Sequence, residues 1–303
     1  MVRTTPPRPV DLEALFPELV PFRREAVRLH PRPGRPGLRD SSLGGPLLWP
    51  RWEPWPRCFD MHEDRLDRGS LSWGQITPEG APFVPVLQLF ADAIPELPFP
   101  TEADLLQVLW CPHVHLRSYA PRPQLYWRNS SRCGEDHPQP PHPRNAQPDY
   151  LPNPCVVHPE RVIDYPRGDM PRELFKSLED RFDQLCETTG WDYEQHLAES
   201  SGVKVGGYPT WTQDPDWPNC PGCDEPMDHL LTINSMEFNG DAWRIWLPLE
   251  DRPATDTEMD FRNPTFVDKM SPHGLSLGDG GGIYIFDCRT CPYHPYTYRY
   301  DCS

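Results

Sequence analysis

Cys220-Pro-Gly-Cys223 and Cys288-Arg-Thr-Cys291 are two CxxC pairs in the second half of a 303-residue chain. Thiolates suit the tetrahedral geometry of zinc, and each CxxC turn lets two sulfurs point toward one centre. The spacing therefore predicts a four-cysteine zinc site. A redox dithiol at Cys220 and Cys223 is the alternative, but the surrounding prolines disfavour the helix that a thioredoxin-like dithiol opens.

The segment that leads into the first pair, Gly206–Cys220, matches the earlier segment Gly44–Cys58 without gaps. Both halves share the order of a Gly-Gly turn, a Trp-Pro loop, a cysteine, two strands and a second cysteine. Because tryptophan and cysteine are rare, we predict an internal duplication. The identical positions are Gly44/Gly206, Gly45/Gly207, Trp49/Trp211, Trp55/Trp217, Pro56/Pro218 and Cys58/Cys220.

Regular elements are expected to be short, because 42 of the 303 residues are proline. Apolar runs predict strands over 84–90, 105–110, 230–234 and 283–286. Leu174, Leu178, Phe182 and Leu185 recur at helical spacing and predict a helix over 170–186, with Asp169 as its cap. Shorter helical segments are expected over 10–15 and 23–29, and a polar surface insertion over 60–80.

The predicted fold class is α+β and β-rich: two pseudo-symmetric repeats with few helices and zinc knuckles. The predicted ranges are 1–118 for the first repeat half with an N-terminal helical segment, 119–169 for a proline-rich linker, and 170–303 for a helix plus the second repeat half. A linker of this kind would allow a cleft between the halves.

The repeat also predicts a metal site in the first half, at Cys58 and Cys111. Each is followed four residues later by a histidine, His62 and His115, and neutral imidazole is an ordinary zinc ligand. We therefore expect a site of two cysteines and two histidines, in which His113 is an alternative to His115. The other interpretation is that both cysteines are buried as small hydrophobic residues after the duplication.

Catalytic signatures are not recognisable in the remaining sequence. Leu277–Gly282 is rich in glycine, but it lacks the pattern of a phosphate-binding loop and predicts a turn. His229, His273 and His294 have no nucleophile in a recognisable arrangement beside them, so we interpret them as structural. Cys133, Cys155, Cys186 and Cys302 lack partners at ligand spacing.

Several of these phrases resemble the YwqG-like family of bacterial proteins, which has no settled activity. They are Val205–Trp211, Cys220–Met227, Leu230–Ile233 and Gly278–Phe286 in the second half, and Pro85–Leu89, Ile94–Pro100 and Asp104–Pro112 in the first. A more distant resemblance is to the N-terminal region of the programmed cell death protein 2 family, carried by Gly206, Gly207, Pro209, Trp211, Cys220, Cys223, Leu231 and Cys288. Members of that family act as chaperones that hold a newly made ribosomal protein, which favours binding over catalysis.

The formal net charge of −16 argues against a general role on nucleic acid and favours a basic protein partner. No membrane-spanning run or signal core is recognisable in the sequence, so we expect a cytoplasmic protein without a membrane partner, in which thiols bind zinc and do not form disulfides. The leading hypothesis is a zinc-stabilised protein-binding module, chaperone-like toward a basic client. The alternatives are a metal-dependent enzyme with an open zinc site in the first half, and an immunity or defence protein.

Overall fold

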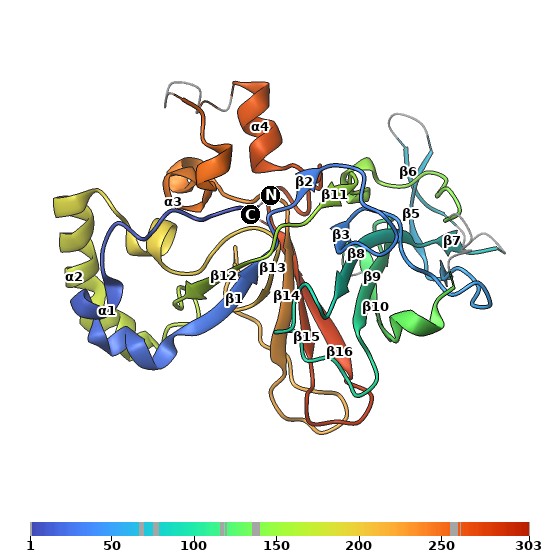
Figure 1. Ribbon diagram of the computed structural model, residues 1–303, viewed down its shortest axis with the longest axis horizontal. Coiled ribbons are helices and arrows are strands. Elements are labelled where there is room, and N and C mark those ends of the chain that lie inside the picture. Colours follow the sequence, from blue (N-terminus) through green and yellow to red (C-terminus); the bar gives the residue numbers. More distant parts are fainter. Residues whose placement is uncertain are drawn as a thin grey trace.

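The computed structural model describes residues 2–66, 70–74, 79–115, 118, 120–134, 140–254, 260 and 262–302. The protein is β-rich with few helices, as predicted. Figure 1 shows the sheets in the middle of the molecule, with α1 (Leu12–Leu15) and α2 (Arg172–Thr189) at one end and the hairpin of β5 (His62–Leu66) and β6 (Ser70–Gly74) at the other. Within the described ranges, no helix has the length and hydropathy needed to cross a membrane.

Two six-stranded antiparallel sheets form the body of the molecule. The first has the order β12 (Glu160–Asp164), β1 (Arg24–Arg28), β13 (Lys204–Gly206), β14 (Asp228–Asn234), β15 (Gly282–Asp287) and β16 (Tyr296–Asp301). The second has the order β2 (Arg32–Pro33), β11 (Cys155–Val156), β3 (Ser42–Leu43), β8 (Val84–Phe90), β9 (Leu105–Cys111) and β10 (Arg122–Arg128). A short pair, β4 (Arg57–Cys58) and β7 (Ala81–Pro82), accompanies the second sheet.

The two sheets agree position by position in strand order and register. β8 pairs with β9 through an irregularity between Pro85 and Leu87, and β14 pairs with β15 through one between His229 and Leu231. Continuing the two registers places Cys111 and Cys288 at the same position of their sheets. A common origin of the halves stays a prediction, but each sheet builds the same frame around its cysteines.

The chain crosses between the sheets at two places. β1 lies in one sheet and β2, a few residues later, in the other, while β11 and β12 make the opposite crossing. The two crossings are in contact, because His158 N donates a hydrogen bond to Leu29 O at 2.6 Å. Leu29 N in turn donates to Val203 O at 2.9 Å. Residues 119–169, expected to be a linker, thus contribute strands to both sheets, and the expected domain ranges do not coincide with the sheets.

Helices cover the end of the first sheet and form a separate core. Leu178, Phe182 and Leu185 form the buried face of α2, and Phe182 stacks on Tyr193 with ring centroids 4.1 Å apart. Gly190 ends α2 in the left-handed conformation, with φ 73°. The remaining helical pieces are η1 (Pro17–Phe22), η2 (Ser130–Arg132), η3 (Pro148–Tyr150), η4 (Tyr193–Leu197), η5 (Gly240–Ala242), α3 (Trp243–Trp246), η6 (Leu249–Asp251) and α4 (Pro264–Met270).

Two of the local expectations were wrong. The segment 23–29 forms strand β1 instead of a helix, because it hydrogen-bonds to β12 on one side and β13 on the other. Asp169 does not cap α2, which has no side-chain cap; its carboxylate accepts a hydrogen bond from Trp217 Nε1. Of the expected insertion over 60–80, β5 and β6 are described, while 67–69 and 75–78 lie outside the described residues.

The Gly-Gly turn of the second half packs against a buried ion pair. Lys204 Nζ lies 2.7 Å from Asp164 Oδ2, and both side chains are fully buried. Asp164 also accepts hydrogen bonds from Ser200 N at 2.8 Å and Tyr208 N at 3.2 Å. A Cβ on Gly207 would lie 2.3 Å from Asp164 Oδ2, so only glycine fits beside this pair.

We expect Gly207→Ala to destabilise the protein far more than Gly190→Ala. Both glycines have positive φ, +67° and +73°, so each substitution carries a backbone cost of about 1–2 kcal/mol. A Cβ at Gly190 meets nothing within 4 Å, whereas at Gly207 it displaces Asp164 and leaves Lys204 unpaired, which costs about 3–5 kcal/mol more. Urea unfolding measures both, and equal losses would contradict this role of the turn.

Candidate metal centres

The four cysteines of the CxxC pairs meet at the tip of the first sheet. Their sulfurs all lie within 4.8 Å of one another. Cys220 Sγ is 3.8 Å from Cys291 Sγ, and Cys223 Sγ is 3.7 Å from Cys288 Sγ. A tetrahedron of thiolates at the usual zinc–sulfur distance of about 2.3 Å has edges of about 3.8 Å. The group therefore has the size that a metal ion such as zinc requires.

Each CxxC pair lies in a tight turn that directs its sulfurs inward. In the first turn, Asp224 N donates to Cys220 O at 2.9 Å and Gly222 N approaches Cys220 Sγ at 3.3 Å. In the second, Cys291 N approaches Cys288 Sγ at 3.4 Å. Figure 1 shows the two loops that carry these turns side by side below β14, β15 and β16. These are the knuckles that the spacing predicted.

The electrostatics of the sulfurs favour a bound cation. The N–H of Gly222 is the largest influence that lowers the pKa of Cys220, to about 7, whereas the neighbouring Cys223 raises the pKa of Cys291 to about 12. Thiols this close cannot all ionise together, because each thiolate disfavours the next. A bound divalent cation removes that conflict and takes all the sulfurs as thiolates.

Aromatic side chains hold the base of this group. Trp211 stacks near Phe286 with ring centroids 6.0 Å apart, and Trp217 meets the edge of the same ring at 5.2 Å. At the corresponding place in the second sheet, Trp49 and Trp55 lie 5.1 Å apart beside Cys58 and Cys111. The tryptophans of the sequence repeat therefore pack beside the cysteines in both halves.

Three of the expected ligands of the first half come together. Cys58 Sγ, Cys111 Sγ and a nitrogen of His115 lie within 4.8 Å of one another, and all three residues are buried. His115 Nε2 is 3.3 Å from Cys58 Sγ, while its Nδ1 lies 3.1 Å from Ala120 O. A proton on Nδ1 that is donated to this carbonyl leaves the Nε2 lone pair for a metal. Contacts with Cys111 and then His115 lower the pKa of Cys58 to about 5.

The two other candidate histidines lie beside this group and not in it. The rings of His62 and His113 stack on each other with centroids 4.2 Å apart, and the His62 ring is 6.4 Å from that of His115. His62 Nδ1 is 3.1 Å from Asp60 O. Within the described residues, the first group therefore contains His115 and neither His62 nor His113.

Next to the first group lies a surface pocket of about 470 Å³ that the sequence did not reveal. Cys58 and Asp60 line it from one side, and Tyr296 and Tyr298 of β16 line it from the other. Asp60 Oδ2 is 3.7 Å from Cys58 Sγ and forms an ion pair with Arg122. The Cys-Phe-Asp spacing of residues 58–60 was the available signal, but carboxylates at such short spacing are too common to single out.

Other cysteines and histidines of the described residues lie outside these two groups. Cys133 and Cys155 are buried and Cys302 is exposed. His229 is buried, with Nε2 3.0 Å from Thr232 Oγ1, and burial lowers its pKa to about 3. His273 Nδ1 accepts a hydrogen bond from Leu275 N at 3.1 Å.

We expect substitutions of residues inside the two groups to lower the metal content of the protein, and substitutions of neighbouring residues to leave it unchanged. Cys223→Ser removes a ligand of the four-sulfur group and His115→Ala removes one of the first group, so each variant loses one bound metal relative to the zinc-loaded wild type. His62→Ala is the matched control, which retains the wild-type content. Elemental analysis of the folded proteins measures this. Loss of metal in His62→Ala, or its retention in His115→Ala, would contradict the ligand set.

Comparison of the sequence with protein-family models found no match, and comparison with curated proteins found none either. The resemblances to the YwqG-like family and to the programmed cell death protein 2 family therefore stay predictions. The function of the chain has to be inferred from the geometry of its own residues.

Proposed function

We propose that the protein is a zinc-stabilised binding module for a basic protein partner, with a chaperone-like role toward it. The four-sulfur group supports the zinc part of this proposal, because four thiolates fill all positions of a tetrahedral ion and leave none for a substrate. Such closed sites contribute directly to folding free energy. The metal is then part of the scaffold, and the binding surface lies elsewhere.

The observation that carries the binding role is the exposure of two large apolar side chains within three residues of Cys58, a member of the first metal group. Phe59 is 56 % exposed and Met61 is 50 % exposed. Clustered apolar exposure of this kind marks surfaces that bind other proteins. The residues at the corresponding repeat positions are Pro221 and Cys223, so the second half has no large apolar side chain at these two positions.

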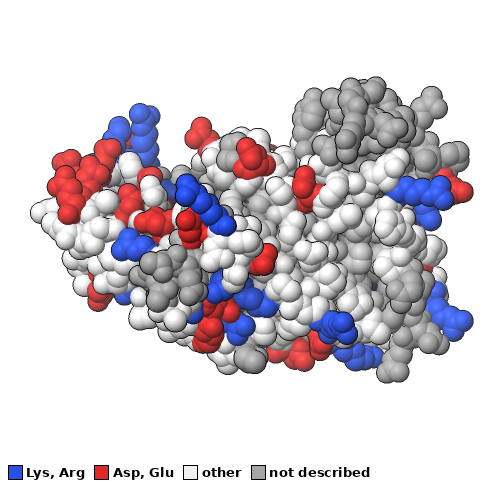
Figure 2. All heavy atoms as spheres, turned by 90° about the horizontal axis from the view of Figure 1, so that it is seen from above, with Lys and Arg blue, Asp and Glu red and all other residues white. Residues whose placement is uncertain are grey.

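Charge supports a basic partner. The net charge of the chain is −16, and α2 presents an exposed row of acidic side chains. Figure 2 shows acidic residues gathered at the end of the molecule where α2 lies. An acidic surface attracts a basic protein and repels nucleic acid. The exposed acidic residues of α2 are Glu173, Glu179, Asp180, Asp183 and Glu187.

We expect the zinc-loaded protein to suppress the aggregation of unfolded lysozyme, which is basic, more strongly than that of unfolded α-lactalbumin, which is acidic. Light scattering during dilution from denaturant measures this, and added salt should weaken the effect because it screens surface charges. Phe59→Ser combined with Met61→Ser should reduce the suppression several-fold. Leu249→Ser, which removes an apolar side chain that is 49 % exposed elsewhere, is the control. Equal action on both substrates, or no loss in the double variant, would contradict the proposal.

A metal-dependent enzyme is the second candidate, and the first metal group is the observation that favours it. Cys58, Cys111 and His115 are three ligands, and two cysteines with one histidine leave a fourth position for water or substrate in catalytic zinc sites. The pocket that Cys58 and Asp60 line gives a substrate a place beside the metal. Zinc with an open position activates water or polarises a carbonyl group.

The two candidates differ in the coordination of this one metal. In Cys223→Ser loaded with cobalt at the first group, an open position predicts that added azide shifts the visible absorption of the cobalt. His115→Ala, in which cobalt occupies the four-sulfur group, is the control and should not respond to azide. An unchanged spectrum in both variants means that protein ligands occupy all coordination positions of the metal in the first group as well. The enzyme candidate then has no open metal position for a substrate.

A further inference from the structure

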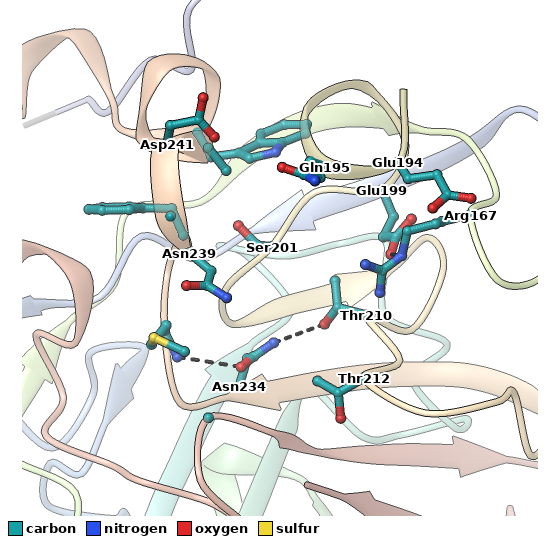
Figure 3. Close-up of a pocket in the computed structure, with 16 residues that line it drawn as sticks. Arg167, Glu194, Gln195, Glu199, Ser201, Thr210, Thr212, Asn234, Asn239 and Asp241 are labelled. Atoms are coloured by element: carbon teal, nitrogen blue, oxygen red, sulfur yellow. Dashed lines mark hydrogen bonds and ion pairs between the residues drawn. The ribbon is translucent and has the colours of Figure 1, made fainter. Parts of the chain in front are cut away.

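A polar pocket of about 250 Å³ lies between the helical end of the molecule and the first sheet, away from both metal groups. Figure 3 shows that its polar side chains come from segments far apart in the sequence and converge on one space. Glu199 and Arg167 lie on one side of it, Asn239 and Asp241 lie opposite, Ser201 lies between them, and Thr210 and Asn234 lie lower in the view.

Glu199 is the feature of this pocket that needs an explanation. Its side chain is only 5 % exposed, and Oε1 lies 3.0 Å from Arg167 Nε. Oε2 is buried and has no hydrogen-bond partner among the described residues. Burial raises the pKa of Glu199 to about 7, so the carboxylate is held in an environment that penalises its charge. A buried acceptor without a partner costs about 1–3 kcal/mol, which a ligand that donates a hydrogen bond recovers.

Two neighbouring polar groups direct donors into the protein. Ser201 Oγ donates to Glu237 O at 2.6 Å, so its lone pairs remain as acceptors. Asn234 Nδ2 donates to Thr210 Oγ1 at 3.0 Å, as a dashed line in Figure 3 shows. Glu199 Oε2 and Ser201 Oγ therefore remain as acceptors, and a ligand that donates hydrogen bonds satisfies them.

The formal charges of the lining favour a cation. Glu194, Glu199 and Asp241 contribute three negative charges, and Arg167 is the only Lys or Arg among the described residues that line the pocket. Asp241 Oδ1 lies 2.8 Å from His196 Nε2, and Arg167 donates to the carbonyl of Trp211 as well as to Glu199. Met236, Phe238 and Trp246 give the same pocket an apolar wall.

Apolar side chains replace two of the residues that line this pocket at the corresponding positions of the first half. By the repeat register, Leu48 corresponds to Thr210, and by the strand registers Phe90 corresponds to Asn234. Leu48 and Phe90 belong to a small buried core cluster together with Leu105 and Cys133. The same frame therefore accepts buried apolar side chains at the two positions where the second half has Thr210 and Asn234.

We propose that this pocket binds a primary ammonium group on an alkyl chain, which a lysine side chain of a protein or a free polyamine presents. The ammonium donates to Glu199 Oε2 and the surrounding acceptors, and its methylene chain lies along the apolar wall. The lysine source rests on the proposed function, since it makes the pocket a contact for the basic partner; the polyamine source does not.

The test compares Nα-acetyl-lysine amide and spermidine with Nα,Nε-diacetyl-lysine amide, which lacks the charge, by isothermal titration calorimetry on the zinc-loaded protein. We expect the charged compounds to bind and the doubly acetylated compound to bind at least tenfold more weakly. Tighter binding of the lysine compound assigns the pocket to a protein side chain, and tighter binding of spermidine to a polyamine. Equal binding of the charged and acetylated lysine compounds, or no binding of either charged compound, overturns the proposal.

Glu199→Gln should weaken binding of the charged compounds at least tenfold, while Glu102→Gln, an exposed carboxyl outside the pocket, should leave it unchanged. Affinity for wild type should rise from pH 6 to pH 8 as Glu199 loses its proton. Arg167, Lys204 and Asp164 are the charged groups that act on Glu199. Unchanged binding in Glu199→Gln overturns the proposal. Ammonium binding without client protection refutes the proposed function alone.

Discussion

The two crossings of the chain between the sheets are the constraint on which the rest of the structure depends. Leu29 hydrogen-bonds both to Val203, which directly precedes strand β13 of the first sheet, and to His158 in the other crossing segment. Val27, Leu29 and Val157 belong to a core cluster that includes strands of both sheets. The sheets therefore cannot separate without breaking backbone hydrogen bonds and exposing this core together, so the halves fold as one body.

This shared frame sets the two metal groups in corresponding places and also explains how they differ. Cys58 and Cys111 occupy the positions of Cys220 and Cys288. Where the second half has Cys223, the first has Met61, which is 50 % exposed and supplies no thiolate. His115 takes part in the first group from the loop after Cys111. One half thus has a closed set of four sulfurs, and the other has three described ligands beside a pocket.

The elements that depend on local sequence could be predicted from it. The elements that depend on contacts between distant parts of the chain could not. Helix α2 was recognisable because its apolar residues recur at helical spacing, strand β8 because it is a short apolar run, and the four sulfurs because CxxC turns fix their own geometry. The segment 23–29 was misjudged because its partners, β12 and β13, are more than a hundred residues away. His62 has the same sequence spacing from its cysteine as His115, and only tertiary packing turns it toward His113.

The two halves differ where buried apolar residues of the first half correspond to polar residues of the second. Leu48 and Phe90 are packed core in the first half, whereas Thr210 and Asn234 at the corresponding places line a pocket with the buried Glu199. Burying such groups opposes folding, because an unpaired polar atom loses its hydrogen bonds to water. The first half shows that the frame accepts buried apolar side chains at these two positions, so stability alone does not account for Thr210 and Asn234 in the second half. Thr210 and Asn234 hydrogen-bond each other, whereas Glu199 Oε2 has no hydrogen-bond partner among the described residues; the ammonium ligand proposed above would provide one.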